Sequence, residues 1–285
     1  MCPRSSEAKP FTSHTNRKSG QIGGKFAGGA SLAALAAGLV LGGGVLSAPS
    51  AYALSGILAT GSGPGSLTVS APAVVTESAG DGINATNNSP GTDLTVTATD
   101  VSGSQDGIDV RNNGTGSISV TTTGSVTGAT GRGIYGVNEN TGVNLTVSAA
   151  GVTGANDGIR VINRGSGATS VTATGMVTGT GRYGLHASNR GTDLTISTAS
   201  VSGGVDGIFA RNNGTGTLSL TSTGTVTGVR RGISLENFGT DLVISTASVS
   251  GGQDGIFARN NGTGTLSLTS TGTVTGASSY GISAR

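Results

Sequence analysis

The sequence predicts an all-β fold, a right-handed parallel β-helix of about ten coils with about 25 residues in each coil. Three observations lead to this prediction: 53 Gly in 285 residues with only 3% aromatic residues, a motif that recurs along the chain, and short bursts of alternating apolar residues. The scarcity of aromatic residues argues against the usual mixed α/β enzyme core. The lack of a Gly-x-y triplet excludes collagen, and the mean hydropathy of +0.05 is too high for a highly charged disordered chain.

The first element, residues 1–53, is expected to be an extended secretory signal peptide. It carries five basic residues and one acid, then an apolar run rich in Gly and Ala over 27–46, and it ends in Ala-Tyr-Ala at 51–53, which fits an A-x-A cleavage site. We expect cleavage after Ala53, and Cys2, the only cysteine, leaves with the peptide. A membrane anchor is the alternative interpretation, because about 20 apolar residues can span a bilayer, but the glycines in the run favour cleavage.

Residues 54–285 are expected to form the β-helix itself. An apolar residue preceded by Gly marks each repeat. The marker residues are Ile57, Ile83, Ile108, Ile134, Ile159, Leu185, Ile208, Ile233, Ile256 and Ile282. After the marker, as in 208–228, three apolar bursts are separated by Gly, Asn and Thr, which is typical of strands and corners. Three strands per repeat describe one triangular coil, and parallel connections wind right-handed by default.

A column of asparagines stands four residues after the marker, where the first coil has Gly61. Its members are Asn87, Asn112, Asn138, Asn163, Asn189, Asn212, Asn237 and Asn260. Asn and Gly adopt the left-handed backbone conformation most readily, so the column predicts a sharp corner with positive φ. Stacked Asn side chains also predict a structural ladder of amide hydrogen bonds from coil to coil.

A second column stands two residues before the marker and is acidic in most coils. It reads Asp81, Asp106, Arg132, Asp157, Tyr183, Asp206, Arg231, Asp254 and Tyr280. Arg and Tyr interrupt the repulsion that an unbroken Asp column would suffer, so we expect an exposed ladder that helps to set the register, each member contributing little. The alternation makes two coils the true repeat unit: 191–228 matches 239–276 at 36 of 38 positions.

No enzyme, cofactor or metal site is expected. Beyond residue 53 the chain has one His, no Cys and no Lys, and it lacks a zinc-ligand pattern, a Walker A loop and G-x-S-x-G. The alternative is a carbohydrate-active β-helix of the polysaccharide lyase or hydrolase type, with paired carboxylates such as Asp81 with Asp106. These carboxylates follow the repeat, whereas a catalytic pair should be local.

The outward positions of the middle strand form a hydroxyl face of Thr and Ser. An ice-binding solenoid is therefore a further, less favoured alternative, because Ser mixes with Thr and Val243 interrupts the face. Nucleic acid is not an expected partner, because residues 54–285 carry more acids than arginines and no Lys. The outward positions that vary between coils are the expected ligand contacts. They are Tyr135, Arg160, His186, Phe209 and Phe257.

The long basic leader, the A-Y-A site and the Cys-free repeats, such as DGIFARNNGTGTLSLTSTGTVTG at 254–276, resemble the passenger domain of a Gram-negative type V autotransporter. The resemblance implies an exported adhesin at the cell surface or outer membrane, with a host or environmental glycan or a matrix protein as partner. Such passengers are followed by an outer-membrane β-barrel, and the sequence shows neither barrel strands nor a cap after its last coil. The resemblance therefore implies a chain truncated at its C-terminus.

Overall fold

The computed structural model describes residues 39–41, 44–47 and 56–285. This part of the chain consists of β-strands and connecting turns, with no helix long and apolar enough to span a bilayer. The predicted signal peptide and its cleavage site after Ala53 lie outside the described residues, except for two short strands.

The strands form three parallel sheets. The first sheet contains β1 (Leu39–Leu41), β3 (Ile57–Gly61), β6 (Ile83–Asn87), β9 (Ile108–Asn112), β12 (Ile134–Asn138), β15 (Ile159–Asn163), β18 (Tyr183–Asn189), β21 (Asp206–Asn212), β24 (Arg231–Asn237), β27 (Asp254–Asn260) and β30 (Ile282–Ala284). The second contains β2 (Gly44–Ser47), β4 (Gly65–Ala71), β7 (Gly91–Ala98), β10 (Ile118–Thr122), β13 (Leu145–Ala149), β16 (Thr169–Ala173), β19 (Leu194–Thr198), β22 (Leu218–Ser222), β25 (Leu242–Thr246) and β28 (Leu266–Ser270). The third contains β5 (Val75–Glu77), β8 (Val101–Gly103), β11 (Ser125–Gly128), β14 (Gly151–Gly154), β17 (Val177–Gly179), β20 (Val201–Gly203), β23 (Val226–Gly228), β26 (Val249–Gly251) and β29 (Val274–Gly276).

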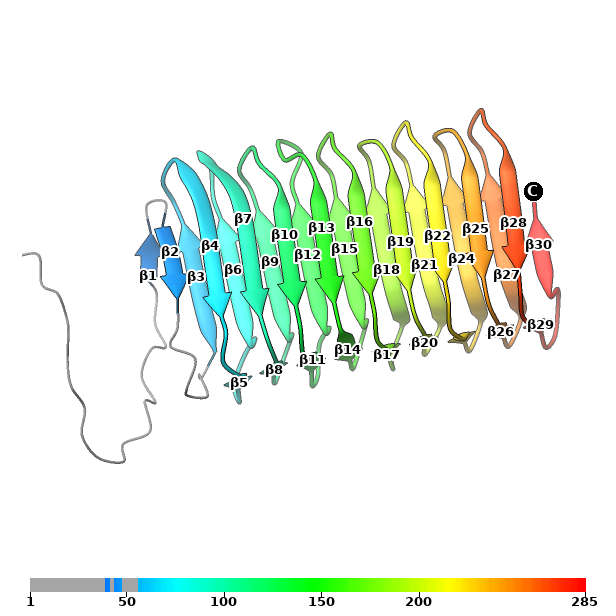
Figure 1. Ribbon diagram of the computed structural model, residues 1–285, viewed down its shortest axis with the longest axis horizontal. Helices are drawn as coiled ribbons and strands as arrows, with labels where there is room; N and C mark the ends of the chain where they lie inside the picture. Colours follow the sequence, from blue (N-terminus) through cyan, green and yellow to red (C-terminus); the bar gives the residue numbers. More distant parts are fainter. Residues whose placement is uncertain (1–38, 42–43, 48–55) are drawn as a thin grey trace, which may run out of the picture. The chain divides into compact units, whose positions relative to one another are not determined.

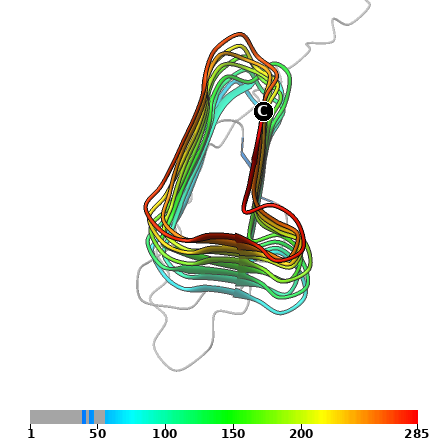
Figure 2. The same ribbon diagram turned by 90° about the vertical axis from the view of Figure 1, so that its right-hand side faces the viewer.

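Each coil contributes one strand to each sheet in turn. Nine complete coils run from β3–β5 to β27–β29, and β30 begins a tenth. Strands of successive coils lie side by side along the solenoid (Figure 1), and the coils superpose around a three-sided outline when viewed along its axis (Figure 2). The predicted parallel solenoid with coils of about 25 residues is confirmed.

The register places like residues on like residues, which builds the core. Ile108, Ile134 and Ile159 pair across neighbouring strands of the first sheet, and all three are fully buried. The second sheet adds columns of Leu, Ile and Val, and the third sheet adds a column of Val. Burial of such a side chain stabilises the fold by about 1.5–3 kcal/mol, so the core depends on this vertical alignment.

The glycine before each marker residue allows the coils to approach closely. A Cβ atom on Gly158 would lie 2.5 Å from the Gly184 carbonyl oxygen of the next coil and 2.8 Å from Val177 Cγ1. Because a carbonyl oxygen of a packed coil cannot move aside cheaply, a larger residue would separate the coils. This close approach explains why Gly precedes every marker residue.

The asparagine column closes the corner after the first sheet from the inside. Asn212 is the last residue of β21 and is fully buried. Its Nδ2 donates to the Gly216 carbonyl at 3.0 Å and to Asn237 Oδ1 at 3.2 Å. Its Oδ1 accepts the Gly214 N–H and the Asn189 side-chain amide. Such side-chain bonds join the column over 87–138 and again over 163–260.

The positive φ expected at these asparagines is wrong. They are the last residues of extended strands, and the described residues show a positive φ at Gly65. The reason is that the corner turns its backbone carbonyls inward, where they need buried donors. The Asn side chains supply these donors, so the column satisfies the corner rather than bending it.

Candidate ligand-binding face

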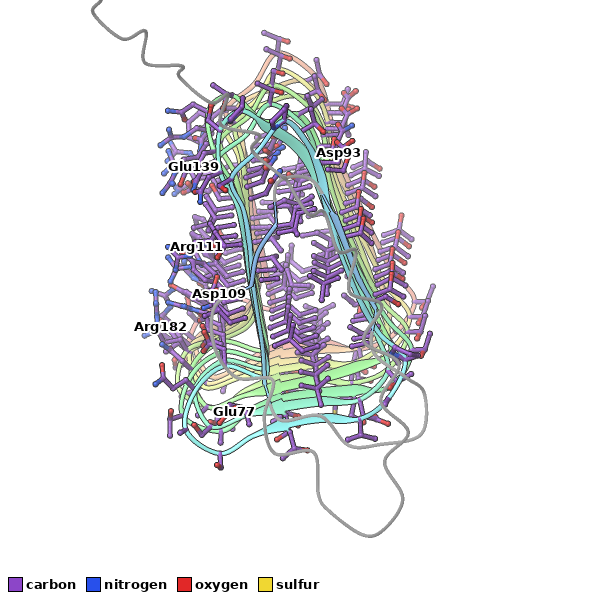
Figure 3. The ribbon with its side chains drawn as sticks, turned by 90° about the vertical axis from the view of Figure 1, so that its left-hand side faces the viewer. Glu77, Asp93, Asp109, Arg111, Glu139 and Arg182 are labelled. Carbon is purple, nitrogen blue, oxygen red and sulfur yellow. The ribbon has the colours of Figure 1, made fainter. Side chains whose placement is uncertain are left out.

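The described part of the chain distributes its polar chemistry unevenly over the three sheets. The outward residues of the second and third sheets are mostly Thr and Ser, with Asp93 and Val243 as exceptions in the second sheet and Glu77 at the end of β5. The first sheet and the turns leading into it carry aromatic and arginine side chains instead, and Figure 3 shows Arg111 and Arg182 together on this one side. We call this set the aromatic–arginine face. Its members are Arg111, Arg132, Tyr135, Arg160, Arg182, Tyr183, His186, Phe209, Arg211, Arg230, Arg231, Phe257, Arg259 and Tyr280.

The five residues expected to contact a ligand lie in one column of this face. Tyr135 pairs with Arg160, Arg160 with His186, and His186 with Phe209. The column then continues through Ser234 to Phe257. All five predicted side chains are half-buried, because the neighbouring coils pack arginines and rings against them.

Three rings form a compact cluster in the middle of the column. The ring centroids of Tyr183, His186 and Phe209 lie 5.2 Å from one another. Tyr183 and Phe209 are stacked, and His186 meets both edge-on. Each such pair contributes about 0.5–1.5 kcal/mol beyond simple burial, so the cluster is a rigid part of the surface.

Guanidinium groups cover further rings of the face. Arg132 lies 4.1 Å from the ring centroid of Tyr135, and Arg231 lies 4.3 Å from that of Phe257. Arg182 stands 4.9 Å from the ring centroid of Tyr183. A cation over a ring face is attracted by the ring quadrupole, which holds these arginines flat along the face.

The carboxylates of the face lie beneath the arginines. The side chains of Asp157 and Asp206 are fully buried, and Arg230 binds Asp206 through two nitrogens at 2.6 and 2.9 Å. Asp206 also accepts the backbone N–H of Arg231 in the next coil at 3.2 Å. Equivalent bonds run from the N–H of the next coil to the other acids of the column. These acids are Asp81, Asp106, Asp157 and Asp254.

The expectation of an exposed acidic ladder is therefore wrong in its exposure. Asp106 and Asp254 are also buried, with only 9% and 7% of their surface exposed, whereas Asp81 is half-buried. The physical reason is that the turn of the next coil lies against each carboxylate, and an arginine of the same or a neighbouring coil binds each acid of the column except Asp81. The column links successive coils through charge-assisted bonds, most of them buried, which are stronger than exposed ion pairs.

Burial also shifts the titration of individual groups. It lowers the pKa of His186 from 6.5 to about 3, and the positive charges of Arg160 and Arg182 add to this effect. Burial raises the pKa of Asp109, partly offset by the hydrogen bond from Arg111. The face therefore presents a neutral imidazole among guanidinium groups at neutral pH.

Five buried polar atoms of the face have no hydrogen-bond partner among the described residues. They are Arg132 Nε, Asp157 Oδ2, Arg160 Nε, His186 Nδ1 and Arg211 Nε. The first four lie in the three successive coils that contain β12, β15 and β18. Buried polar groups are normally paired, so this part of the face has unused bonding capacity.

His186 makes the stability of the fold sensitive to acid. The unfolded chain protonates this imidazole below about pH 6.5, whereas the folded chain does so only near pH 3. The contribution of His186 to the free energy of unfolding is therefore fully present above pH 6.5 and is lost as the pH falls toward 3. At pH 5 about 2 kcal/mol of it is lost. We measure the free energy of unfolding by urea titration at pH 8 and at pH 5. Its decrease between the two pH values is expected to be about 2 kcal/mol smaller in His186→Phe than in the unsubstituted protein. Equal losses in both proteins would contradict the shift.

The described residues contain no group of three His, Cys, Asp or Glu side chains arranged to hold a metal ion. The pairs Asp81 with Asp106 and Asp106 with Asp109 do lie on neighbouring positions. However, Asp81 accepts the Asp106 N–H, and Asp109 is held by Arg111 at 3.1 Å. Asp81 therefore links two coils, whereas Asp109 pairs within its own strand.

Sequence reasoning missed the arginines of the turns, Arg182 and Arg230, and it treated Arg132 and Arg231 only as breaks in the acidic column. The signal was present three residues before the marker, where Arg182 and Arg230 occupy alternate coils. No protein-family model, curated protein or solved structure matches the chain.

Proposed function

We propose that this chain is an exported, non-enzymatic protein of the cell surface, whose solenoid displays an adhesive face in the manner of an autotransporter passenger. The observation that carries the proposal is the concentration of the aromatic and arginine side chains of the described residues on the first sheet and the turns at its two ends. A solenoid needs only small polar residues on its outer surface to remain soluble. Aromatic rings and arginines are the residues that dominate binding surfaces, so their concentration on one sheet favours recognition.

The arrangement of the carboxylates supports a non-enzymatic role. A general acid or base must reach a substrate atom, whereas Asp157 and Asp206 are covered and committed to backbone and arginine bonds. His186, with its pKa near 3, is a weak base and is packed between two rings. The sequence features of the leader, described above, support export.

The test has an export arm and a binding arm. The full chain, expressed in Gram-negative cells, is expected to appear outside the cytoplasm with Leu54 as its N-terminal residue. The exported protein is then applied to arrays of glycans and matrix proteins. Phe209→Ser with Tyr135→Ser should reduce binding at least tenfold, whereas the control Val243→Ser on the second sheet should leave it unchanged.

Three results would contradict the proposal. Retention of residues 1–53 in a cytoplasmic protein would overturn export. Equal binding by the face variant and the control, in proteins with matching circular dichroism, would overturn the adhesive face. Release of new reducing ends or unsaturated sugars from a bound glycan would favour the carbohydrate-active alternative.

A further inference from the structure

We propose that the aromatic–arginine face binds an acidic polysaccharide that lies along the solenoid axis and carries one acidic group on every second sugar. This inference rests on the adhesive face proposed above and names its ligand class. Three properties of the described residues support it: a local excess of arginines over carboxylates in the coils of β12, β15 and β18, rings between the charges, and a spacing of two coils.

The positive charge is not fully balanced within the face. Arg132 bridges Asp106 and Asp157, at 3.3 and 3.7 Å, and Asp157 is shared with Arg160 at 3.8 Å. Arg182 has no ion-pair partner in the described part of the chain, and it stands over the Tyr183 ring. Because the carboxylates lie below and the guanidinium groups above, an approaching ligand meets the cations first. A ligand carboxylate or sulfate would complete this charge balance, and Arg is suited to bind either.

Three of the four unpaired buried nitrogens of the face lie in the same place. Arg132 Nε, Arg160 Nε and His186 Nδ1 belong to the three coils with the charge excess. A polyanion that contains no sugar rings would pair with the guanidinium groups but would leave the apolar surface of the face uncovered. The exposed parts of Tyr135 and of the Tyr183–Phe209 cluster add apolar surface beside the guanidinium groups, and this surface can contact the C–H groups of sugar rings.

The spacing of the turn arginines sets the repeat of the ligand. Arg132 precedes β12, Arg182 precedes β18, and Arg230 with Arg231 leads into β24, so the positions recur at every second coil. Neighbouring strands lie about 4.8 Å apart, which places these charges at intervals of about 10 Å along the axis. An extended polysaccharide repeats on this scale after two sugars. One acidic group in each disaccharide therefore meets one arginine position.

A single-stranded nucleic acid also combines anions with rings, but it fits this face less well. Its phosphates recur at every nucleotide, and Glu236 and the buried acids oppose a continuous line of phosphates. A polymer with alternating acidic and neutral units avoids this repulsion. Single-stranded DNA is therefore the appropriate competitor class for the test.

The experiment measures binding of the full chain to defined polymers by calorimetry. The probes are hyaluronan oligosaccharides of four, six and eight sugars, dextran sulfate, neutral dextran and a single-stranded oligothymidine. Hyaluronan is expected to bind more tightly with each added disaccharide and to weaken with added salt, because the contacts are ionic. Neutral dextran and oligothymidine are expected to bind at least tenfold more weakly than the eight-sugar hyaluronan.

Arg182→Gln is expected to weaken hyaluronan binding at least tenfold, because this arginine has no structural ion pair to lose. The matched control Arg190→Gln removes one exposed positive charge from the corner beyond the first sheet and should change binding less than twofold. Comparison with dextran sulfate separates carboxylate from sulfate recognition. Binding of either polymer supports the inference if Arg182→Gln weakens it.

The failures of the two proposals are distinguishable. Binding of a neutral glycan or a matrix protein through Phe209, without any acidic polymer, would overturn the ligand class and leave the adhesive face standing. Tighter binding of oligothymidine than of hyaluronan would overturn the ligand class in favour of nucleic acid. Absence of binding to every glycan and matrix protein would overturn both proposals.

Discussion

Asn212→Leu is expected to lower the free energy of unfolding by about 4 kcal/mol. The substitution nearly preserves side-chain volume, so the loss comes from hydrogen bonds and not from a cavity. Four bonds disappear, each of which contributes about 0.5–1.5 kcal/mol, and the Gly214 N–H is left buried without a partner, which costs about 1–3 kcal/mol. The Gly216 carbonyl keeps the Thr240 N–H as a donor.

The neighbouring Asn213 offers a matched control, because it is exposed at the same corner. Asn213→Leu is expected to change the free energy of unfolding by less than about 0.5 kcal/mol. Urea titration followed by circular dichroism measures both values. A comparable loss in the two variants would show that the asparagine column acts through corner propensity and not through its buried amides.

Arg230→Met is expected to destabilise the protein by about 3 kcal/mol, because it leaves the buried Asp206 carboxylate without its counter-ion. The two bonds from this guanidinium, at 2.6 and 2.9 Å, are replaced by a neutral thioether. The backbone N–H of Arg231 remains as a donor to Asp206, which limits the loss. Thermal and urea unfolding at pH 7 report the effect.

Arg211→Met provides the comparison, because its ion pair with Glu236 spans 3.6 Å and both side chains are partly exposed. Its cost is expected to stay below about 1 kcal/mol. Adding Asp206→Asn to Arg230→Met should recover most of the lost stability, since the buried charge is then removed. Failure of the double variant to recover would mean that Arg230 acts by packing and not by charge.

The coil architecture was predictable because its cause is local and repeated. The glycine before each marker has to let coils approach, and the strands alternate apolar and polar residues, so both leave a period in the sequence. Tyr135, Arg160 and His186 each follow a marker residue by one position, and the structure places them in one column. Position within a repeat is enough to place a residue on a sheet.

Other features depend on contacts between coils, and these contacts cannot be predicted from a residue's position relative to the marker. The Asn212 offset is compatible with a left-handed corner and with a buried side chain, and only the inward carbonyls decide between them. The burial of Asp206 depends on how Arg230 folds over it from the next coil. For the same reason the cluster of Tyr183 with Phe209 arises between two coils and could not be recognised from either alone.

The near identity of 191–228 and 239–276 indicates that two-coil modules can be gained or lost in the gene. Each coil contacts only its neighbours, so a two-coil module can be duplicated or deleted in the gene without disturbing the others. Each added module extends the rod and supplies another copy of Phe209 and Arg211, as Phe257 and Arg259 do here. For a polymeric ligand this raises avidity with no change in any single contact. Copy number at the locus would then tune adhesion strength in discrete steps, by recombination instead of point mutation.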